Sequence, residues 1–499
     1  MKKKEKRSPN PNPRNLSATK NKIPFYHLLL QYSNTALNII FPLILFPYMT
    51  RTLGPSGYGV LGFYESMMLV VTVLAAFGVN YYGLRLLSKS AIGDTDQANT
   101  VLHLLLINGI MALLGVAIYF VYIALKPVHI GNWTISILYG YIMVIYLFNA
   151  DWYFQSQEKY RFLLLRTLIL RLFVLVSALV FVRQPAHLIY YIVISAINYS
   201  LIAVSTGWNL RHLLRHWHWD PALLRKLITA LSPFAVMGIL SSLYFAIDTI
   251  LLARYGRITE LGHYTVAVKI VRLSLNVFVA ASIVFFVKLF RTRVDRSLQA
   301  DSMLMTVHLS IPVSALLFFL AEPVIRFISG ESYLPSVPLL QLFALLWVIV
   351  PLHDFFAIQV LMVHHKEKQL VIIYGFACVL SFVLNVMLIP LWFTQGAAIA
   401  IVLTEIFVLV ATIWQSRSHF RFRWQHFGEV MGCLLCFPVA YGASSFAAGW
   451  SSQPVLQLII VTIGTLVVYA GIQWYVLANP FWKRMIRSLT IEKETSRPV

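Results

Sequence analysis

The chain of 499 residues is 59% hydrophobic and only 12% charged, and its mean hydropathy is +0.73. Soluble domains contain about 45–50% apolar and about 25% charged residues, so this composition excludes an ordinary soluble protein. The formal net charge of +21 would suit a nucleic-acid ligand, but the basic residues cluster between apolar segments, as they do in membrane proteins.

Apolar runs of about 20 residues recur along the chain, and each is long enough to cross about 30 Å of hydrocarbon. They predict an all-α polytopic membrane protein with about fourteen transmembrane helices. The loops between the runs are short and leave no room for a sizeable extramembrane domain. The predicted spans are residues 27–50, 60–82, 101–125, 134–154, 162–182, 187–209, 228–253, 263–286, 302–322, 338–363, 370–390, 396–415, 429–448 and 455–477.

The lysine and arginine residues predict the orientation of these spans. With the N-terminus inside, the inside segments hold 30 of the 40 Lys and Arg residues, and the outside loops hold six. Cytoplasmic segments of membrane proteins are enriched in these residues, so the split predicts a multi-pass protein with both termini in the cytoplasm. The positive charge is then explained by topology, and we expect no nucleic-acid partner.

Two segments resemble each other: RTLGPSGYGVLGFYES follows the first span, and ARYGRITELGHYTVAVKIV follows the seventh. Each has a glycine-centred turn and then a glycine–aromatic pair that opens the next helix. Six spans separate the two, which predicts two pseudo-symmetric six-helix bundles related by an axis along the membrane normal, with two C-terminal helices added. The predicted parts are a cytoplasmic basic arm (1–26), an N-terminal bundle (27–210), a cytoplasmic linker (211–227), a C-terminal bundle (228–415), two additional transmembrane helices (429–477) and a cytoplasmic tail (478–499).

The first of these segments concentrates glycine between two apolar runs. Gly54, Gly57 and Gly59 predict a tight turn. Arg51 can extend its side chain to the outer interface. Glu65 has no such explanation, because it lies inside the second span.

Ionisable residues deep in a span cost at least about 2.5–3.5 kcal/mol to insert, so they face a cavity or a partner. Cations predominate toward the centre of the spans and come from both halves of the chain. They predict a central cationic cavity between the two bundles that accepts an anionic headgroup. The alternative is a purely structural role in interhelical salt bridges, of which Asp248–Lys269 is the most evident. The residues concerned are Glu65, Arg166, Arg171, Asp248, Lys269, Arg272, Asp354 and Glu405.

Several patterns point away from enzymes and bound metals. The sequence contains no G-x-x-x-x-G-K-[ST] phosphate loop and no H-E-x-x-H metal helix. No large outer loop carries the paired carboxylates that acid–base catalysis needs. Cys433 and Cys436 have CxxC spacing but lie in an apolar run, which favours buried structural thiols. We therefore expect no catalytic residue, no metal site and no cofactor.

At two places the residues resemble a known family. FPYMTRTLGPSGYGVLGFYES, followed by FGVNYYGLRLLSKS (residues 77–90), resembles the N-terminal signature of polysaccharide repeat-unit flippases, including the O-antigen flippases. AIDTILLARYG and ELGHYTVAVKI, within residues 246–270, resemble the seventh and eighth helices of the same family. These flippases belong to the multidrug/oligosaccharidyl-lipid/polysaccharide exporter superfamily.

The resemblance implies transport of an undecaprenyl-pyrophosphate-linked oligosaccharide from the inner to the outer leaflet of the bacterial cytoplasmic (inner) membrane. Two bundles would work by alternating access, in the assembly of O-antigen, capsule or exopolysaccharide. The implied partners are this lipid-linked oligosaccharide, membrane lipids, and the polysaccharide polymerase and chain-length machinery.

The resemblance also assigns roles to the residues inside the spans. Substrate binding maps onto Arg171, Lys269 and Arg272, with Arg51 and Arg85 near the two mouths of the cavity. The carboxylates are candidates for ion coupling or gating, either as partners of the cations or as proton-binding groups: Asp248, Glu65, Asp354 and Glu405.

Two alternatives stay open. One is a cation-coupled multidrug or metabolite exporter of the same superfamily. The multidrug branch often carries a carboxylate in its first helix, whereas the first span here offers only Asn34 and Asn38, which counts against an exporter of that kind. The other is a non-transporting membrane scaffold or a biosynthetic enzyme of the same pathway.

Overall fold

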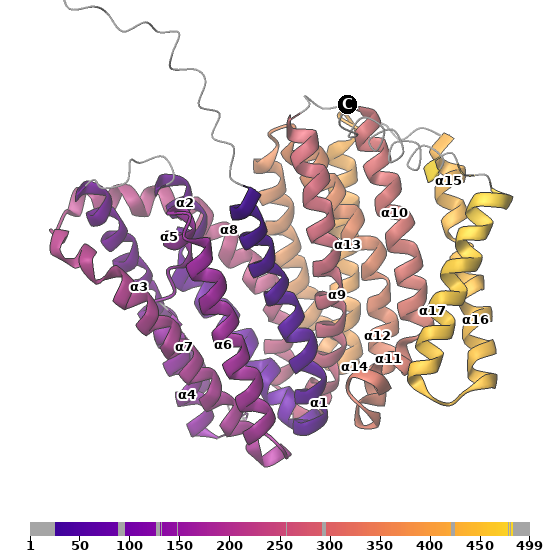
Figure 1. Cartoon of the computed structure of the whole chain (residues 1–499), viewed down its shortest axis with the longest axis horizontal. Coiled ribbons are helices and arrows are strands. Elements are labelled where there is room, and N and C mark those ends of the chain that lie inside the picture. Colours follow the sequence, from indigo (N-terminus) through magenta and orange to yellow (C-terminus); the bar gives the residue numbers. More distant parts are fainter. Residues whose placement is uncertain are drawn as a thin grey trace, which may run out of the picture.

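The computed structural model is an array of helices that lie side by side (Figure 1). Within the described residues every regular element is helical and no strand occurs, which confirms the predicted all-α class. The structure describes residues 25–87, 95–125, 130, 132–146, 148–255, 257–291, 296–420, 425–477, 479 and 481–482.

The first half of the chain forms the part drawn from indigo to magenta in Figure 1. Its first helix begins at Phe25 on one face of the molecule and kinks at Gly54 on the opposite face; we call these the Phe25 face and the Gly54 face. The elements are α1 (Phe25–Ala76), α2 (Val79–Leu87), α3 (Thr95–Leu125), α4 (Trp133–Tyr146), α5 (Asp151–Ser156), α6 (Tyr160–Phe181), η2 (Pro185–His187), α7 (Leu188–Leu210) and η3 (Arg211–His216).

The second half continues across Figure 1, and its last helices, α15–α17, pack against α10 and α11 at the far edge. The elements are α8 (Pro221–Ala253), α9 (Ile258–Arg291), α10 (Arg296–Phe319), α11 (Ala321–Ile328), η4 (Glu331–Ser336), α12 (Val337–Ala344), α13 (Leu346–Asp354), η5 (Phe355–Met362), α14 (Glu367–Ser416), α15 (Gln425–Cys433), α16 (Cys436–Trp450), α17 (Pro454–Gly471) and η6 (Ile472–Val476). The domain boundaries drawn from the sequence stay predictions.

Among the described residues, 11 helical segments are long and apolar enough to cross a membrane. Two of these fold back on themselves. α1 has 52 residues and would extend about 78 Å if straight, but it turns at Gly54 (φ 67°, ψ 176°). α14 has 50 residues and turns at Phe393 (φ 49°, ψ −117°). The predicted span 27–50 therefore falls on the first arm of α1, whereas 60–82 covers the second arm and runs on into α2. The count of fourteen crossings stays a prediction.

The outer helix faces present large apolar side chains. Leu113, Ile169, Val204 and Leu391 are 60%, 63%, 67% and 69% exposed. They lie on α3, α6, α7 and α14, so the apolar surface is distributed around the molecule. Soluble proteins rarely expose so much contiguous apolar surface, whereas lipid is its natural neighbour. The predicted multi-pass membrane class is thus confirmed.

The two halves approach most closely where the second arm of α1 meets the start of α9. A Cβ added to Gly59 would lie 2.1 Å from the carbonyl oxygen of Ile258, and one added to Gly262 would lie 1.8 Å from that of Pro55. No real side chain fits at such distances, so backbone lies against backbone, as small residues allow in membrane helices. We call this the glycine contact.

The glycine contact changes the interpretation of the glycine-rich segment. Gly54 does supply the turn, with the positive φ that favours glycine. Gly59, however, lies inside the second arm of α1 and allows another helix to approach. The two glycine–aromatic pairs that resemble each other in the sequence, at Gly62 and Gly262, thus lie in α1 and α9, the two helices that meet here.

We expect Gly59→Ala to lower the melting temperature of the detergent-solubilised protein by several degrees. The added methyl group meets backbone atoms that cannot rotate away, and overpacking of this kind costs about 1–3 kcal/mol. Gly375→Ala is the matched control, since its Cβ would meet nothing within 4 Å in α14. A Gly59→Ala variant as stable as Gly375→Ala would contradict the backbone contact between the halves.

Candidate functional site

Lys269 of α9 forms an ion pair with Glu65 of α1. Its Nζ lies 2.9 Å from Glu65 Oε2. The ammonium also lies 5.3 Å from the centre of the Tyr58 ring and 5.8 Å from that of Phe46, within the range of a cation–π interaction. The pair joins the two halves of the chain, and it supplies the partner that Glu65 lacked in the sequence.

Asp248 of α8 does not pair with Lys269, contrary to the salt bridge expected from their similar depth. Its carboxylate is 1% exposed and accepts hydrogen bonds from the Tyr264 hydroxyl and from the backbone N–H of Thr249 at 2.7 Å. Tyr264 and Lys269 are five residues apart on α9, so they point about 140° away from each other around the helix. The sequence analysis gave the position of Asp248 and Lys269 along their helices, but not the side of the helix on which each residue lies.

Arg272 is the cation nearest to Asp248. Its Nη2 lies 4.0 Å from Asp248 Oδ2 and donates a hydrogen bond of 2.9 Å to the carbonyl oxygen of Phe245. The guanidinium also lies over the Phe245 ring, at 5.3 Å from the centroid. The side chain remains 39% exposed, although it lies well inside α9. Arg272 is therefore only loosely paired with the carboxylate beside it.

Arg171 of α6 donates a hydrogen bond of 3.0 Å to Oδ1 of Asn38 in the first arm of α1. Lys269 pairs with Glu65 in the second arm of the same helix. Two of the three cations predicted to form a cavity thus contact α1, one from each half of the chain.

A second group of polar residues lies in α8, α13 and α14, and we call it the Glu405 cluster. The Tyr244 hydroxyl donates to Glu405 Oε1 at 2.5 Å, and His353 Nε2 lies 3.0 Å from Glu405 Oε2. His353 Nδ1 faces Asp354 Oδ1 at 3.7 Å. The predicted Asp354 and Glu405 are therefore brought together by His353, which the sequence analysis missed. Its position beside Asp354 inside a span was the available signal.

Three other basic residues have their own surroundings. Arg166 is 8% exposed and pairs with Asp151 at 2.5 Å, so its charge has a carboxylate partner within the first half. Arg51 donates to the carbonyl oxygens of Arg326 and Ile328, both at 3.3 Å, and to that of Phe327. It thereby caps the last turn of α11. Arg85 is exposed in the last turn of α2.

The described residues contain no group of three or more His, Cys, Asp or Glu side chains that could hold a metal ion. Cys433 and Cys436 are buried and unbonded to each other, as expected for structural thiols. The described part of the site consists instead of cations, carboxylates and hydroxyl groups carried by helices of both halves. Such a site is suited to binding an anion and to holding or moving protons.

Comparison with known proteins identifies the family of this chain. Residues 25–292 match the family model described as polysaccharide biosynthesis protein, which is more than half of the 499-residue chain. The chain belongs to this family. The match spans α1 to α9 and so includes both partners of the Lys269–Glu65 pair.

Two relatives of this family member are named as O-antigen transporters. The protein of Escherichia coli (strain K12) is 24% identical over 385 residues, which cover 74% of this chain and 91% of the relative. That of Shigella dysenteriae is 21% identical over 398 residues, covering 77% and 98%. Transport, and not catalysis, is the activity named for each relative.

Solved structures share the fold. The lipid II flippase MurJ in an inward closed conformation matches with a TM-score of 0.70 at 13% identity, over 91% of this chain and 100% of MurJ. An inward-facing multidrug resistance transporter of the MATE family in the MOP superfamily matches with a TM-score of 0.57 at 15% identity, over 77% and 94%. The family model and the O-antigen transporters confirm the predicted resemblance to a family of polysaccharide-related transporters, and the solved structures show that the fold is shared.

The Lys269–Glu65 pair can be tested by a double-mutant cycle on the melting temperature. We expect Lys269→Met and Glu65→Gln each to destabilise the protein, and the double variant to lose less than the sum. The side chains are 29% and 41% exposed, so we expect a coupling of about 0.5–1 kcal/mol.

The control cycle uses Arg326→Met and Glu322→Gln, a pair of 3.0 Å within α11 that does not join the halves. This i,i+4 pair should show a coupling of at most about 0.5 kcal/mol. Strictly additive losses at Lys269 and Glu65 would show that the pair does not hold the halves together.

Proposed function

We propose that this chain is a flippase that moves an undecaprenyl-pyrophosphate-linked oligosaccharide from the inner to the outer leaflet of the bacterial cytoplasmic membrane. Family membership, the O-antigen transporters among its relatives and the MurJ-like fold support a flippase of polysaccharide precursors. The lipid-linked substrate and the alternating access are argued from the charged residues that follow.

The observation that supports the proposal most is that Arg272 is partly exposed and only weakly paired. Its guanidinium lies deep in α9, is 39% exposed and has one carboxylate at 4.0 Å, which is already occupied by Tyr264 and Thr249. A guanidinium has five donors in a planar fork, which suits a pyrophosphate oxygen pair. Lys269 lies one turn away and adds a second positive charge. An anionic headgroup would gain from both.

The Lys269–Glu65 pair provides a gate for alternating access. It joins α9 to α1 next to the glycine contact, and so it holds the halves together toward the Gly54 face. An anionic headgroup would compete with Glu65 for the Lys269 ammonium. Release of Glu65 would remove a bond between the halves and allow the Gly54 face to open. Of the four carboxylates that the sequence analysis offered for ion coupling or gating, this assigns the gating role to Glu65.

The Glu405 cluster supports a proton as the coupling ion. His353 lies between two carboxylates, with Nε2 3.0 Å from Glu405 and Nδ1 3.7 Å from Asp354, so these three groups can hold a proton among them. The cluster and the proposed headgroup site meet on α8, where Tyr244 donates to Glu405 and the next residue, Phe245, accepts from Arg272. Proton uptake at the cluster would then be linked to the binding of an anion at Arg272.

The orientation follows from the positive-inside split: the Phe25 face would be cytoplasmic and the Gly54 face external. Arg85, near the Phe25 face, would be an early contact of the headgroup, whereas Arg51 would hold α11 at the exit. Contacts with a polymerase and with chain-length machinery stay predictions.

The arrangement speaks against a drug exporter. The polar residue that the first arm of α1 presents to Arg171 is the neutral Asn38. A cation-coupled exporter of the multidrug branch would use a carboxylate in this helix. Cationic dyes would also meet Arg171, Lys269 and Arg272, which repel them.

Arg272→Ala should reduce surface polysaccharide by about tenfold or more, because a hydrogen bond to a charged group contributes about 1.5–3 kcal/mol. The assay uses bacterial hosts that lack their own repeat-unit flippase and carry different repeat units. Surface polysaccharide is compared with lipid-linked repeat units in the inner leaflet.

Arg183→Ala, a change of an exposed arginine beyond the end of α6, is the control and should rescue as well as the parent. If Arg272→Ala rescued as well as the parent, the headgroup would not bind at Arg272. Resistance to cationic dyes, with no rescue in any host, would favour the exporter.

Glu405→Gln should abolish the stimulation of transport by an imposed proton gradient, while gradient-independent exchange continues. Glutamine can still hydrogen-bond to Tyr244 and His353, the two residues in contact with Glu405, but it cannot take up a proton. The measurement is headgroup exchange in reconstituted vesicles with and without the gradient. Unchanged stimulation in Glu405→Gln would exclude the cluster as the coupling site.

A further inference from the structure

The segment that joins the two halves presents aromatic and basic side chains to the outside of the molecule. It comprises the end of α7, η3 and the residues that lead into α8. Three tryptophans in this segment are between 43% and 66% exposed, and a leucine is 64% exposed. We call this the linker surface. Its exposed side chains are those of Trp208, Arg211, Leu214, Arg215, Trp217 and Trp219.

The turns of η3 separate this surface from the core. In a 3₁₀-helix, side chains three residues apart lie directly above one another. Leu210 and Leu213 form one such row and are buried in a hydrophobic cluster that includes the start of α3. Arg211 and Leu214 form the next row, which is exposed. Trp208 lies one turn earlier, and the Arg211 guanidinium is 4.0 Å from the centre of its ring.

The linker surface is held in place by α3. Asn99 donates from Nδ2 to Nε2 of His218 at 3.0 Å and accepts the backbone N–H of the same residue at 3.2 Å. His103 is 0% exposed and accepts the backbone N–H of Asp220 at 3.3 Å. Its ring also stacks on that of Trp217, with 4.8 Å between the centroids. The aromatic residues of the surface are therefore fixed on the first half.

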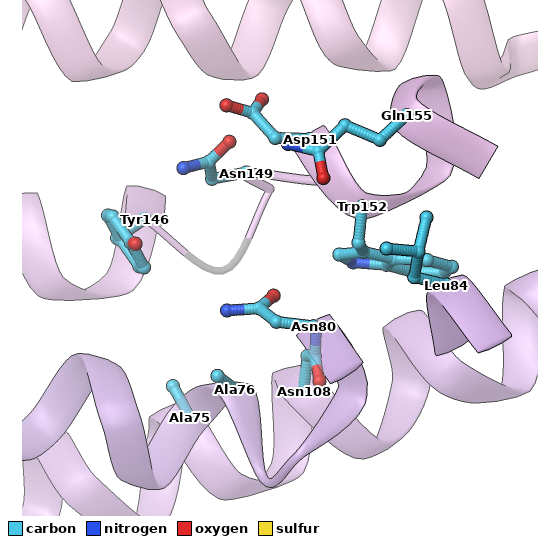
Figure 2. A pocket seen from close by; sticks show the side chains of 10 residues that line it. All are labelled: Ala75, Ala76, Asn80, Leu84, Asn108, Tyr146, Asn149, Asp151, Trp152 and Gln155. Atoms are coloured by element: carbon cyan, nitrogen blue, oxygen red, sulfur yellow. The ribbon is translucent and has the colours of Figure 1, made fainter. Parts of the chain in front are cut away.

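The end of α7 is also fixed from inside the first half. Thr206 accepts a hydrogen bond of 3.4 Å from Arg166, which pairs with Asp151. Asp151 lines a pocket between α1, α2, α3 and α5, and Figure 2 shows it next to Asn149. The inner side of the segment is thus buried and hydrogen-bonded to the protein. Its outward side chains are the part that can contact a partner outside the chain.

The linker surface lies at the Phe25 face, where one spanning segment ends and the next begins. α2 lies at this face in Figure 1, and η3 packs against α3, which follows α2 in the chain. The two apolar segments that meet here are Pro185–His216 and Pro221–Ala253. Tryptophan is enriched at the ends of membrane spans, where its ring lies among the lipid headgroups. We therefore expect lipid headgroups next to this surface.

The positive charges of this surface have no acidic partner in the part of the chain that the structure describes. No carboxylate lies within ion-pair distance of Arg211 or Arg215. The same holds for Arg225 and Lys226, which are exposed at the start of α8 and extend the charge into the second half. Clusters of Lys and Arg next to a membrane span attract anionic lipid headgroups. The exposed tryptophans and Leu214 favour a lipid over a soluble acidic protein, because only the lipid also supplies hydrocarbon.

We propose that the linker surface binds the headgroups of anionic phospholipids, such as phosphatidylglycerol, in the leaflet on the Phe25 side. Its arginines bind phosphate oxygens, and its tryptophans anchor the segment at the level of the headgroups. The surface carries charges from both halves, so a bound lipid acts on the connection between them. This inference goes beyond the proposed function, because it does not depend on what the chain transports.

The test uses the full chain in phosphatidylcholine nanodiscs that contain a rising fraction of photoactivatable phosphatidylglycerol. Peptide mass spectrometry measures the labelling of residues 208–226, and the lipid fraction at half-maximal labelling reports the affinity. We expect the double variant Arg211→Gln, Arg215→Gln to raise this fraction about 25-fold, which is about fivefold for each charge removed. Both side chains are exposed, so the variant should melt at the temperature of the parent.

The matched control is the double variant Lys159→Gln, Arg161→Gln. These two exposed residues lie at the start of α6, and Trp152, the nearest tryptophan along the chain, is 2% exposed. The control removes the same charge without changing the linker surface, so its labelling should equal that of the parent. An equal loss in both double variants would show that the lipid responds only to the overall charge, and would overturn the inference.

Two further measurements identify the occupant. Photoactivatable phosphatidylcholine should label the linker segment weakly, and equally in the parent and in the Arg211→Gln, Arg215→Gln variant. Unlabelled phosphatidylglycerol should compete with the labelled lipid, whereas inorganic phosphate should not. Labelling by phosphatidylcholine as strong as that by phosphatidylglycerol, or competition by phosphate alone, would overturn an anionic phospholipid as the ligand. Absence of labelling in the parent would overturn the site itself.

Discussion

The close approach of α1 and α9 at Gly59 and Gly262 sets the register on which the charged residues depend. Both helices run from the Gly54 face toward the Phe25 face. Glu65 follows Gly59 by six residues and Lys269 follows Gly262 by seven, so both lie about 9–10 Å beyond the glycine contact. A larger side chain at either glycine would separate the helices and remove the ion pair. The close packing of the two halves therefore depends on these two glycine positions, and the ion pair depends on that packing.

Within that register the cations are compensated to different degrees. Lys269 and Arg166 each have a carboxylate at hydrogen-bond distance. Arg272 shares a carboxylate at 4.0 Å with a tyrosine, and Arg171 has a neutral amide. An unpaired charge is costly inside a membrane, so an anionic ligand gains most at the two least compensated cations. Arg171 belongs to the first half and Arg272 to the second. The binding of a ligand that contacts both therefore depends on the relative positions of the two halves.

The sequence predicted what depends on composition and on distance along a helix. The membrane class and the helical fold were accessible, because the length and spacing of the apolar runs determine them, whereas the depth of the in-span charges stays a prediction. The pairing of Asp248 was not, because a carboxylate can be satisfied by the Tyr264 hydroxyl, which carries no charge to reveal it. The role of Gly59 was hidden because a glycine for a turn and a glycine for close packing look alike in sequence. His353 was overlooked because histidine is neutral in most counts of buried charge.

Arg272 connects the two ionic centres of the second half. Its guanidinium lies beside Asp248 and donates to the carbonyl oxygen of Phe245, the residue that follows Tyr244, and Tyr244 in turn donates to Glu405. Under the proposed function, an anion bound at Arg272 would add negative charge near the cluster, and proton uptake by the cluster would become easier. Linkage requires the reverse as well: a proton on the cluster leaves more of the Arg272 charge for the anion. Anion binding and protonation would thus favour each other, and their coupling needs no contact between the two ligands.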